Sequence, residues 1–233
     1  YRFFCLYLHP YSVERKKMDK NVIKQIILWQ QEFVGKVRLQ NRSVSFDENA
    51  NYVLVGIRRA GKSYILYQHI QHLVAQGHSR EEILFVNFED ERITDIKKEE
   101  LHLIIEAYRE LFSYEPIIFL DEIQNVDGWE HFARRLADEK YRVFITGSNA
   151  HMLSREIAST LGGRYLTKEI YPFSFKEYLE YQGITLSSHW ELSPVKADVI
   201  RLFAHYYYFG CMSEMSNMQD KQSWLQSLYQ KIL

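Results

Sequence analysis

One stretch constrains the fold of this chain more than any other, the run YVLVGIRRAGKS from Tyr52 to Ser63. Its first residues form a short apolar run typical of a buried strand, and its last residues begin a helical pattern. Gly56 and Gly61 bound the turn between them and permit backbone angles and close approaches that a Cβ would prevent. Such a turn directs successive backbone N–H groups inward, where the following helix adds the positive end of its dipole. The stretch therefore predicts a phosphate-binding loop.

The residues of this loop have distinct expected roles. The spacing G-x-x-x-x-G-K-S is that of the P-loop of nucleotide-binding proteins. Lys62 would reach the β- and γ-phosphates of ATP, and the Ser63 hydroxyl would coordinate Mg²⁺. A chance match in an ordinary strand–helix turn is the alternative, but the flanking pattern is the context that the motif requires. We expect the nucleotide to contact Gly56, Ile57, Arg58, Arg59, Ala60, Gly61, Lys62, Ser63 and Tyr64.

Two adjacent acids close a second informative stretch, the run PIIFLDE that begins at Pro116. In P-loop hydrolases a buried strand delivers such an acid beside the phosphate site. Asp121 would hold the Mg²⁺ shell, while Glu122 would point the other way in the pleat and polarise the attacking water. A strand that ends in a charged turn is the alternative, and the P-loop upstream argues against it.

Polar residues also follow the apolar strand predicted over 141–149. Ser148, Thr146 and Asn149, in that order, are candidates for a hydrogen bond to the γ-phosphate or the water, although Asn149 is also well placed to cap the next helix. Arg164 follows a glycine turn, where it is either an arginine finger that stabilises phosphoryl-transfer charge or an ordinary ion-paired arginine. The expected catalytic residues are therefore Glu122, Lys62, Ser148 and Arg164.

Composition and charge indicate an ordinary globular protein. The chain has 233 residues, of which 46% are hydrophobic and 25% charged, enough for one large domain or one and a half. The net charge of −1 gives no argument for nucleic acid or a membrane surface, and no apolar run approaches a membrane span. Cys5 and Cys211 lie far apart with no metal-ligand spacing, which indicates free thiols in a reducing compartment.

The two ends of the sequence are unusual. The first 17 residues are aromatic-rich, and the basic cluster at Arg15 follows the apolar part, the reverse of a signal peptide, so we expect the cytoplasm. One hypothesis is that Met18 is the natural start and that an upstream reading frame supplies the residues before it, and the alternative is a poorly ordered tail. At the other end, an apolar helical pattern over 224–233 has no cap and needs a partner surface. We therefore expect the protein to be longer.

Helical and strand patterns alternate through the middle of the chain, which predicts a parallel sheet covered by helices. Capping boxes predict helix starts at Asp127 with Glu130 and at Ser174 with Glu177. Gly35 is a plausible end for the first helix. The predicted helices cover 19–35, 62–76, 97–112, 127–139, 150–160, 174–183 and 199–209, and the further strands cover 83–88, 116–121, 141–149 and 165–170.

Five motifs, in this order, resemble a prokaryotic family of AAA-type P-loop ATPases. They are Gly56–Ser63, Leu120–Gln124, Ile145–Ser148, Gly163–Arg164 and Pro172–Tyr178. The resemblance covers roughly residues 20–182. It implies an α/β three-layer P-loop NTPase sandwich with a central parallel sheet of order 5-1-4-3-2, followed by a C-terminal helical segment.

The resemblance also implies roles and a continuation. It places Ser148 or Thr146 near the γ-phosphate as a first sensor, and Arg164 where AAA proteins carry an arginine finger that usually acts on a neighbouring subunit. Members of the family generally continue into a winged-helix and nuclease-like region of uncertain function, and 199–233 resembles only its beginning. No arginine of the chain is assigned as a second sensor.

These patterns predict an N-terminal tail over 1–18, an ATPase domain over 19–183 and a helical segment over 184–233. The expected activity is hydrolysis of ATP with Mg²⁺. The alternative is a nucleotide-gated switch with little turnover that binds a protein or DNA. A small-molecule kinase fits less well, because a base beside the Mg²⁺ acid suits water. Expected partners are ATP, further copies of the chain, and DNA or protein through the missing C-terminal region.

Overall fold

The computed structural model describes residues 17–147 and 160–210, together with residues 220, 222–223 and 225–227. Several predictions from the sequence lie outside these residues. They concern the tail before residue 17, the two cysteines, Ser148, Asn149, most of the helix over 150–160 and most of the apolar segment over 224–233.

The core of the molecule is a five-stranded, all-parallel sheet with the order β2-β3-β4-β1-β5. This is the predicted order, read from the opposite edge, and it confirms the P-loop NTPase sandwich. The four strands β1 to β4 are short, largely buried apolar runs, as expected for a parallel sheet covered by helices, whereas the edge strand β5 is mostly exposed. The strands are β1 (Asn51–Val55), β2 (Ile83–Asn87), β3 (Ile117–Asp121), β4 (Arg142–Gly147) and β5 (Tyr165–Glu169).

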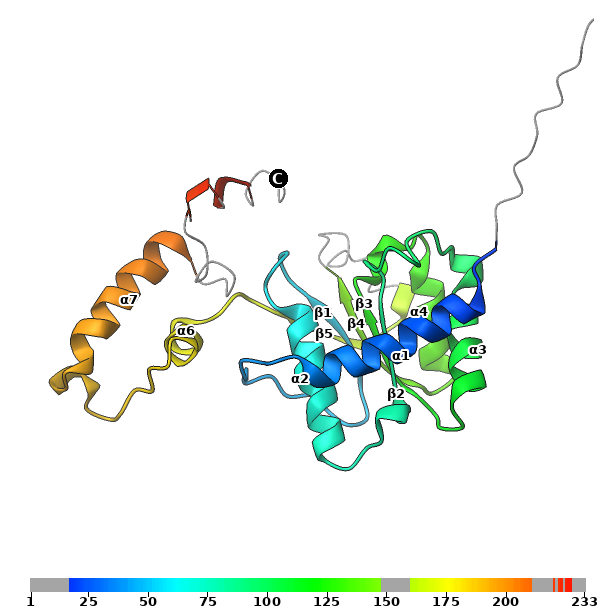
Figure 1. Ribbon diagram of the computed structural model, residues 1–233, viewed down its shortest axis with the longest axis horizontal. Helices are drawn as coiled ribbons and strands as arrows, with labels where there is room; N and C mark the ends of the chain where they lie inside the picture. Colours follow the sequence, from blue (N-terminus) through cyan, green and yellow to red (C-terminus); the bar gives the residue numbers. More distant parts are fainter. Residues whose placement is uncertain (1–16, 148–159, 211–219, 221, 224, 228–233) are drawn as a thin grey trace, which may run out of the picture.

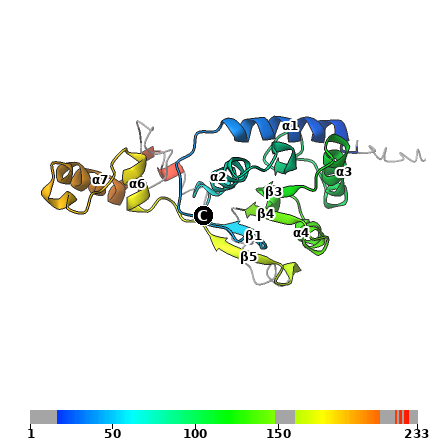
Figure 2. The same cartoon turned by 90° about the horizontal axis from the view of Figure 1, so that it is seen from below.

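Helices cover both faces of this sheet (Figure 2). Side chains alternate across a strand, so Tyr52 and Leu54 of β1 pack with α2, whereas Val53 and Val55 pack with α3 and α4. Helix α1 contacts β2, the edge strand, and its residues belong to the cores of both faces. The helices are α1 (Lys20–Lys36), α2 (Lys62–Ala75), α3 (His102–Leu111), α4 (Trp129–Asp138), α6 (Phe175–Tyr181) and α7 (Val195–Phe209).

The register of the strands determines which residues share an edge of the sheet. Val55 pairs with Gly147 on one side and with Glu169 on the other. Asp121 pairs with Asn87 at the end of β2. The P-loop after β1, the acids after β3 and the polar end of β4 therefore lie at one edge, the carboxyl edge, where α/β sheets bind ligands.

Helices α6 and α7 pack against each other and form a small core of their own beside the sheet (Figure 1). Ser174 caps α6 with Glu177 as its reciprocal partner, which confirms the predicted capping box. That small core contains Tyr178, Leu179, Val199 and Leu202.

Two predicted helix ends are wrong. Asp127 does not cap α4, because Gly128 occupies the N-cap position in a left-handed conformation with no side-chain cap. Gly35 does not end α1, which continues to Lys36 with Val37 as its C-cap. Within the described residues, no helix combines the length and the apolar character that crossing a bilayer requires.

Candidate nucleotide site

The P-loop is built on two glycines with positive φ. Gly56 follows β1 with φ +154°, and a Cβ on it would lie 2.1 Å from the carbonyl oxygen of Ile170. Gly61 has φ +91° and forms the N-cap of α2 without any side chain to occupy the space before the helix. Arg59 also adopts a left-handed φ of 66°. The loop is thus held in the conformation that the motif requires, with the N-terminus of α2 behind it.

Lys62 lies within this loop. It is 3% exposed, and its ammonium donates hydrogen bonds to the carbonyls of Gly56 and Ile57, both at 3.1 Å. Its Nζ lies 3.9 Å from Oε1 of Glu122. Burial lowers the pKa of Lys62, and the carboxylates of Glu122 and Asp121 oppose that shift. A buried ammonium with two neutral acceptors is suited to bind phosphate oxygens more strongly than carbonyls.

Asp121 joins the P-loop helix to β4. Its Oδ1 accepts hydrogen bonds from the hydroxyl of Ser63 at 3.0 Å and from that of Thr146 at 2.5 Å. The carboxyl group is fully buried, which raises the pKa of Asp121 to about 6, while the hydrogen bonds from Thr146 and Ser63 act in the opposite direction. The three side chains predicted near the metal and the γ-phosphate are therefore in direct contact.

These residues fit a divalent cation. Oδ2 of Asp121 is buried and has no hydrogen-bond partner, which is a costly arrangement unless a cation or its water completes it. Mg²⁺ prefers oxygen ligands and usually takes one or two from the protein, with the rest from water and phosphate. The hydroxyl of Ser63 and the carboxylate of Asp121 are such a pair.

Glu122 reaches the site by a different route from the one expected. The pleat of β3 does not direct it, because Glu122 follows the strand in a left-handed conformation with φ 54° and ψ 40°. Its backbone N–H donates to Oγ1 of Thr146 at 3.0 Å, and its Oε2 accepts a hydrogen bond from the amide of Gln124 at 2.6 Å. The carboxylate nevertheless lies beside Lys62, as a base for the attacking water requires.

The remaining predicted nucleotide contacts lie around the loop. Arg58 is exposed, and its guanidinium lies 3.4 Å from the carboxylate of Glu89. Tyr64 is 56% exposed on the first turn of α2. Ala60 is buried, and its carbonyl accepts a hydrogen bond from Arg42. Ser148, the first choice for the sensor, lies outside the described residues, whereas Thr146 lies in the site.

Arg164 lies at the amino edge of the sheet, where the strands begin, opposite the carboxyl edge that carries the P-loop. It precedes Tyr165, which pairs with Asn51 at the start of β1, so the length of β1 separates it from the P-loop. Five residues of strand correspond to about 16 Å. Its Nε donates to Oδ1 of Asp138 at the end of α4, at 2.5 Å. Within one copy of the chain, Arg164 is therefore too far away to act on the P-loop.

Sequence reasoning missed Arg42, which contacts the outer side of the P-loop. Its Nη1 donates to the carbonyl of Ala60 at 3.0 Å, and its guanidinium forms an ion pair with Glu177. The segment before β1 has no motif, and Arg42 and Glu177 are 135 positions apart in the sequence. No local pattern could have identified the contact.

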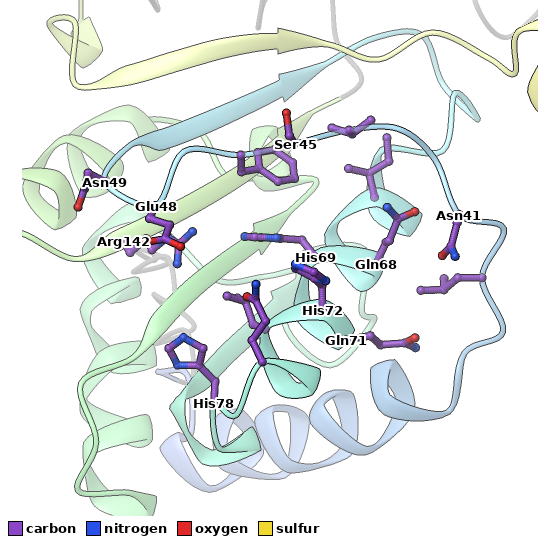
Figure 3. Close-up of a pocket in the computed structure, with 16 residues that line it drawn as sticks. Asn41, Ser45, Glu48, Asn49, Gln68, His69, Gln71, His72, His78 and Arg142 are labelled. Carbon is purple, nitrogen blue, oxygen red and sulfur yellow. The ribbon is translucent and has the colours of Figure 1, made fainter.

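A large groove lies apart from this site. It has a volume of about 830 Å³ and runs along α2 between residues 39–49 and the start of β4 (Figure 3). His69 and Arg142 line it, and no residue from Gly56 to Ser63 does. The groove is thus distinct from the phosphate-binding loop.

Comparison with known proteins identifies the family. The AAA domain family matches residues 40–179, more than half of the chain. An uncharacterised protein of Methanocaldococcus jannaschii is 33% identical over 207 residues, which cover 88% of this chain and 45% of that protein. An uncharacterised protein of Haemophilus influenzae is 40% identical over 138 residues, which cover 58% of this chain and 34% of that protein. The chain spans less than half the length of these curated relatives.

Solved structures are similar at low sequence identity. Caenorhabditis elegans PCH-2 matches with a TM-score of 0.47 and 10% identity, over 92% of this chain and 68% of that one. AMPPCP-bound DnaA from Aquifex aeolicus matches with a TM-score of 0.42 and 14% identity, over 95% of this chain and 71% of that one. From the family match, together with the P-loop and the strand order described above, the chain belongs to the AAA family of P-loop ATPases.

Proposed function

We propose that this domain binds ATP with Mg²⁺ at the P-loop and hydrolyses the γ-phosphate bond. The observation that carries the proposal is the contact of Ser63, Asp121 and Thr146 at the carboxyl edge of the sheet, with Lys62 and Glu122 beside them. All five side chains come from segments that the strand register brings to one place.

Each residue has a role that its surroundings support. Backbone N–H groups from Gly56 to Ser63 would bind the phosphates, and Lys62 would exchange its two carbonyl acceptors for β- and γ-phosphate oxygens. Ser63 and Asp121 would hold Mg²⁺, which neutralises charge on the phosphates. Glu122 would accept a proton from the attacking water.

A nucleotide-gated switch is the second candidate, and the contact of Gln124 with Glu122 favours it. The amide of Gln124 donates to Oε2 of Glu122 at 2.6 Å, so one oxygen of the general base is already occupied. In this case, hydrolysis of ATP would be slow until the contact between Gln124 and Glu122 breaks. Under this alternative, ATP would set the affinity of the longer protein for a protein or DNA.

The test measures ATP binding and phosphate release with and without Mg²⁺. Lys62→Ala should abolish binding, whereas Lys36→Ala, at an exposed lysine of α1, should change neither quantity. Glu122→Gln should keep binding and lower turnover by at least ~10²-fold, as expected for loss of a general base. Binding without turnover in the wild-type chain would favour the switch, and unchanged ATP affinity in Lys62→Ala would overturn both.

Partners are tested in the same assay. Hydrolysis with and without DNA, alongside the mass of the protein in solution with ATP, separates the candidates. Stimulation by DNA would support a nucleic-acid role that the net charge of −1 alone does not. A mass that rises with ATP would support assembly of several copies.

A further inference from the structure

The motif from Pro172 to Tyr178 has no role in the proposed ATP site, yet its side chains reach the P-loop through Arg42. Glu177 was predicted only as the second half of a capping box. In the structure its Oε1 also accepts from Nε of Arg42 at 2.8 Å and its Oε2 from Nη2 at 3.3 Å, so each oxygen takes one bond from the guanidinium. This is the bidentate geometry in which a guanidinium and a carboxylate are most specific.

The same guanidinium contacts three further groups. Its Nη1 donates to the carbonyl of Ala60 in the P-loop at 3.0 Å. Its Nη2 donates to the carbonyl of Tyr171 at 2.9 Å, in the connection from β5 to α6. Its Cζ lies 5.3 Å from the centre of the Phe173 ring. One side chain thus joins the phosphate-binding loop, the connection and the start of α6.

Arg42 is itself firmly placed. Its backbone N–H donates to the side chain of Gln68, and the amide of Gln68 donates back to the carbonyl of Arg42, both at 2.8 Å. Gln68 belongs to α2, the helix that carries Lys62 and Ser63. The guanidinium therefore extends from the body that holds the P-loop, and a shift of α6 relative to that body must change its contacts.

The ion pair is shielded from water. The side chain of Arg42 is 10% exposed and that of Glu177 is 19% exposed. Burial acts to raise the pKa of Glu177, but the hydrogen bonds from Arg42 and Ser174 outweigh it and lower the pKa. Salt screens such a pair less than an exposed one.

A shift of α6 would displace α7 as well, because the two helices pack together. Tyr178 and Leu179 of α6 pack with Val199 and Leu202 of α7, and the hydroxyl of Tyr206 on α7 donates to the carbonyl of Phe173. The two helices lie together at one end of the molecule (Figure 1). A change in the contacts of Arg42 would therefore change the placement of both helices.

We propose that Arg42 is a positioning residue of the P-loop, and that its bidentate pair with Glu177 links occupancy of the nucleotide site to the placement of α6 and α7. The proposal rests on the proposed binding of ATP. Phosphate bound to the N–H groups of the loop would fix the orientation of its peptides, and the carbonyl of Ala60 faces Arg42 on the outer side. Linkage is reciprocal, so holding α6 in place also favours nucleotide binding.

The first experiment measures the dissociation constant of Mg·ATP in four chains: wild type, Arg42→Gln, Glu177→Gln and the double variant. Glu177→Gln is the sharper change, because glutamine keeps the capping box and loses the charge. We expect each single variant to bind roughly tenfold more weakly, within the usual range for linked sites. The double variant should be no worse than either single one, because the two groups act as a unit.

Three controls separate this role from general damage. Arg38→Gln, at an exposed arginine of the same segment, should leave ATP affinity unchanged. Lys176→Gln, at an exposed lysine of α6, should also leave ATP affinity within about twofold of wild type, well short of the range for linked sites. Arg42→Lys should bind ATP as weakly as Arg42→Gln, because a lysine cannot make the bidentate contact with Glu177.

The second experiment measures backbone hydrogen exchange over residues 175–181 and 195–209, with and without saturating Mg·ATP. In the wild-type chain ATP should change the protection of both helices. In Glu177→Gln at saturating ATP, the P-loop should still be protected, but the change over α6 and α7 should be lost. A purely structural role would lower affinity and leave that change intact.

The outcomes decide between the two proposals. If the wild-type chain binds ATP and Lys62→Ala abolishes binding, the nucleotide site stands. In that case unchanged ATP affinity in Glu177→Gln, or no ATP-dependent protection of α6 and α7 in the wild type, overturns the role of Arg42. If the wild-type chain binds no ATP, the proposed function fails and the link fails with it.

Discussion

The hydroxyl of Thr146 donates a hydrogen bond to Oδ1 of Asp121, with 2.5 Å between the two oxygens. The same hydroxyl accepts from the backbone N–H of Glu122, so one residue of β4 holds the carboxylate of Asp121 and the backbone of Glu122 at the end of β3. Thr146 is fully buried, and its strand pairs directly with β3. The expected metal ligand and the expected base are therefore positioned by a common neighbour.

Thr146→Val should lower ATP turnover by about 10- to 100-fold, because it removes the hydroxyl that orients a metal ligand while keeping the shape of the side chain. Binding of nucleotide without Mg²⁺ should change little. The measurement is turnover and affinity at several Mg²⁺ concentrations. Thr167→Val on β5, where the threonine is exposed, is the matched control. Equal turnover in the two variants would show that Thr146 does not orient the site.

Gly56→Ala should destabilise the fold by more than about 3 kcal/mol, because the new Cβ would clash with the carbonyl of Ile170 and strain the backbone as well. Gly77→Ala is the comparison, since Gly77 also has a positive φ but has open space around it. It should cost only about 1–2 kcal/mol of backbone strain. Urea unfolding of the two variants measures the difference. Similar losses would mean that the contact with Ile170 is easily relaxed.

Arg164→Ala should lower hydrolysis only if neighbouring copies complete the site, because Arg164 lies far from its own P-loop. We expect that loss, and we expect mixing with Glu122→Gln copies to restore part of the activity. Each mixed pair then contains one site with both an intact Glu122 and a neighbour's Arg164. Activity is measured against the mixing ratio. Full activity in Arg164→Ala alone would leave Arg164 as the ion-pair partner of Asp138.

Acid should destabilise the domain partly through His69, which packs on Phe46 and Phe144 and lies near Arg142 and His72. Burial lowers its pKa from 6.5 to about 3, with Arg142 and His72 adding to the shift. In the unfolded chain His69 is therefore protonated below about pH 6.5, whereas in the folded chain it stays neutral down to about pH 3. Stability should fall across that window as the pH falls, by up to about 1.4 kcal/mol per pH unit.

The check for His69 is urea unfolding at pH values from 7 to 4. His69→Gln should be less stable at neutral pH, because the histidine packs against aromatic rings, but its stability should fall less steeply with acid. His131→Gln, at an exposed histidine on α4, should keep the slope of the wild-type chain. The same slope in all three chains would place the acid sensitivity elsewhere.

The sequence predicted the fold well because its strongest signals are local. The glycines of the P-loop, the apolar strands and the acids at Asp121 and Glu122 each follow from spacing within a few residues. The strand order followed from the resemblance, and the structure confirms it. The turn that places Glu122 was not predicted, because a left-handed φ at glutamate has no sequence signature.

Contacts between distant segments were beyond the reach of sequence patterns. Arg42 and Glu177 meet only because β1 and β5 are neighbours and their flanking segments fold back to the same place. The choice between Ser148 and Thr146 could not be settled from spacing, since both belong to the polar end of one predicted strand. The structure shows the hydroxyl of Thr146 on Asp121, which only the register of β3 and β4 determines.

The placement of Arg164 also limits how copies of the chain could assemble. If it serves a neighbouring nucleotide site, the amino edge of one sheet must face the carboxyl edge of the next. Where the contact is not reciprocated by the same neighbour, it joins two different surfaces and closes into a ring or extends as a filament. A two-fold symmetric dimer could serve both catalytic centres only with its two sheets antiparallel, since each copy's Arg164 would then meet the other copy's P-loop.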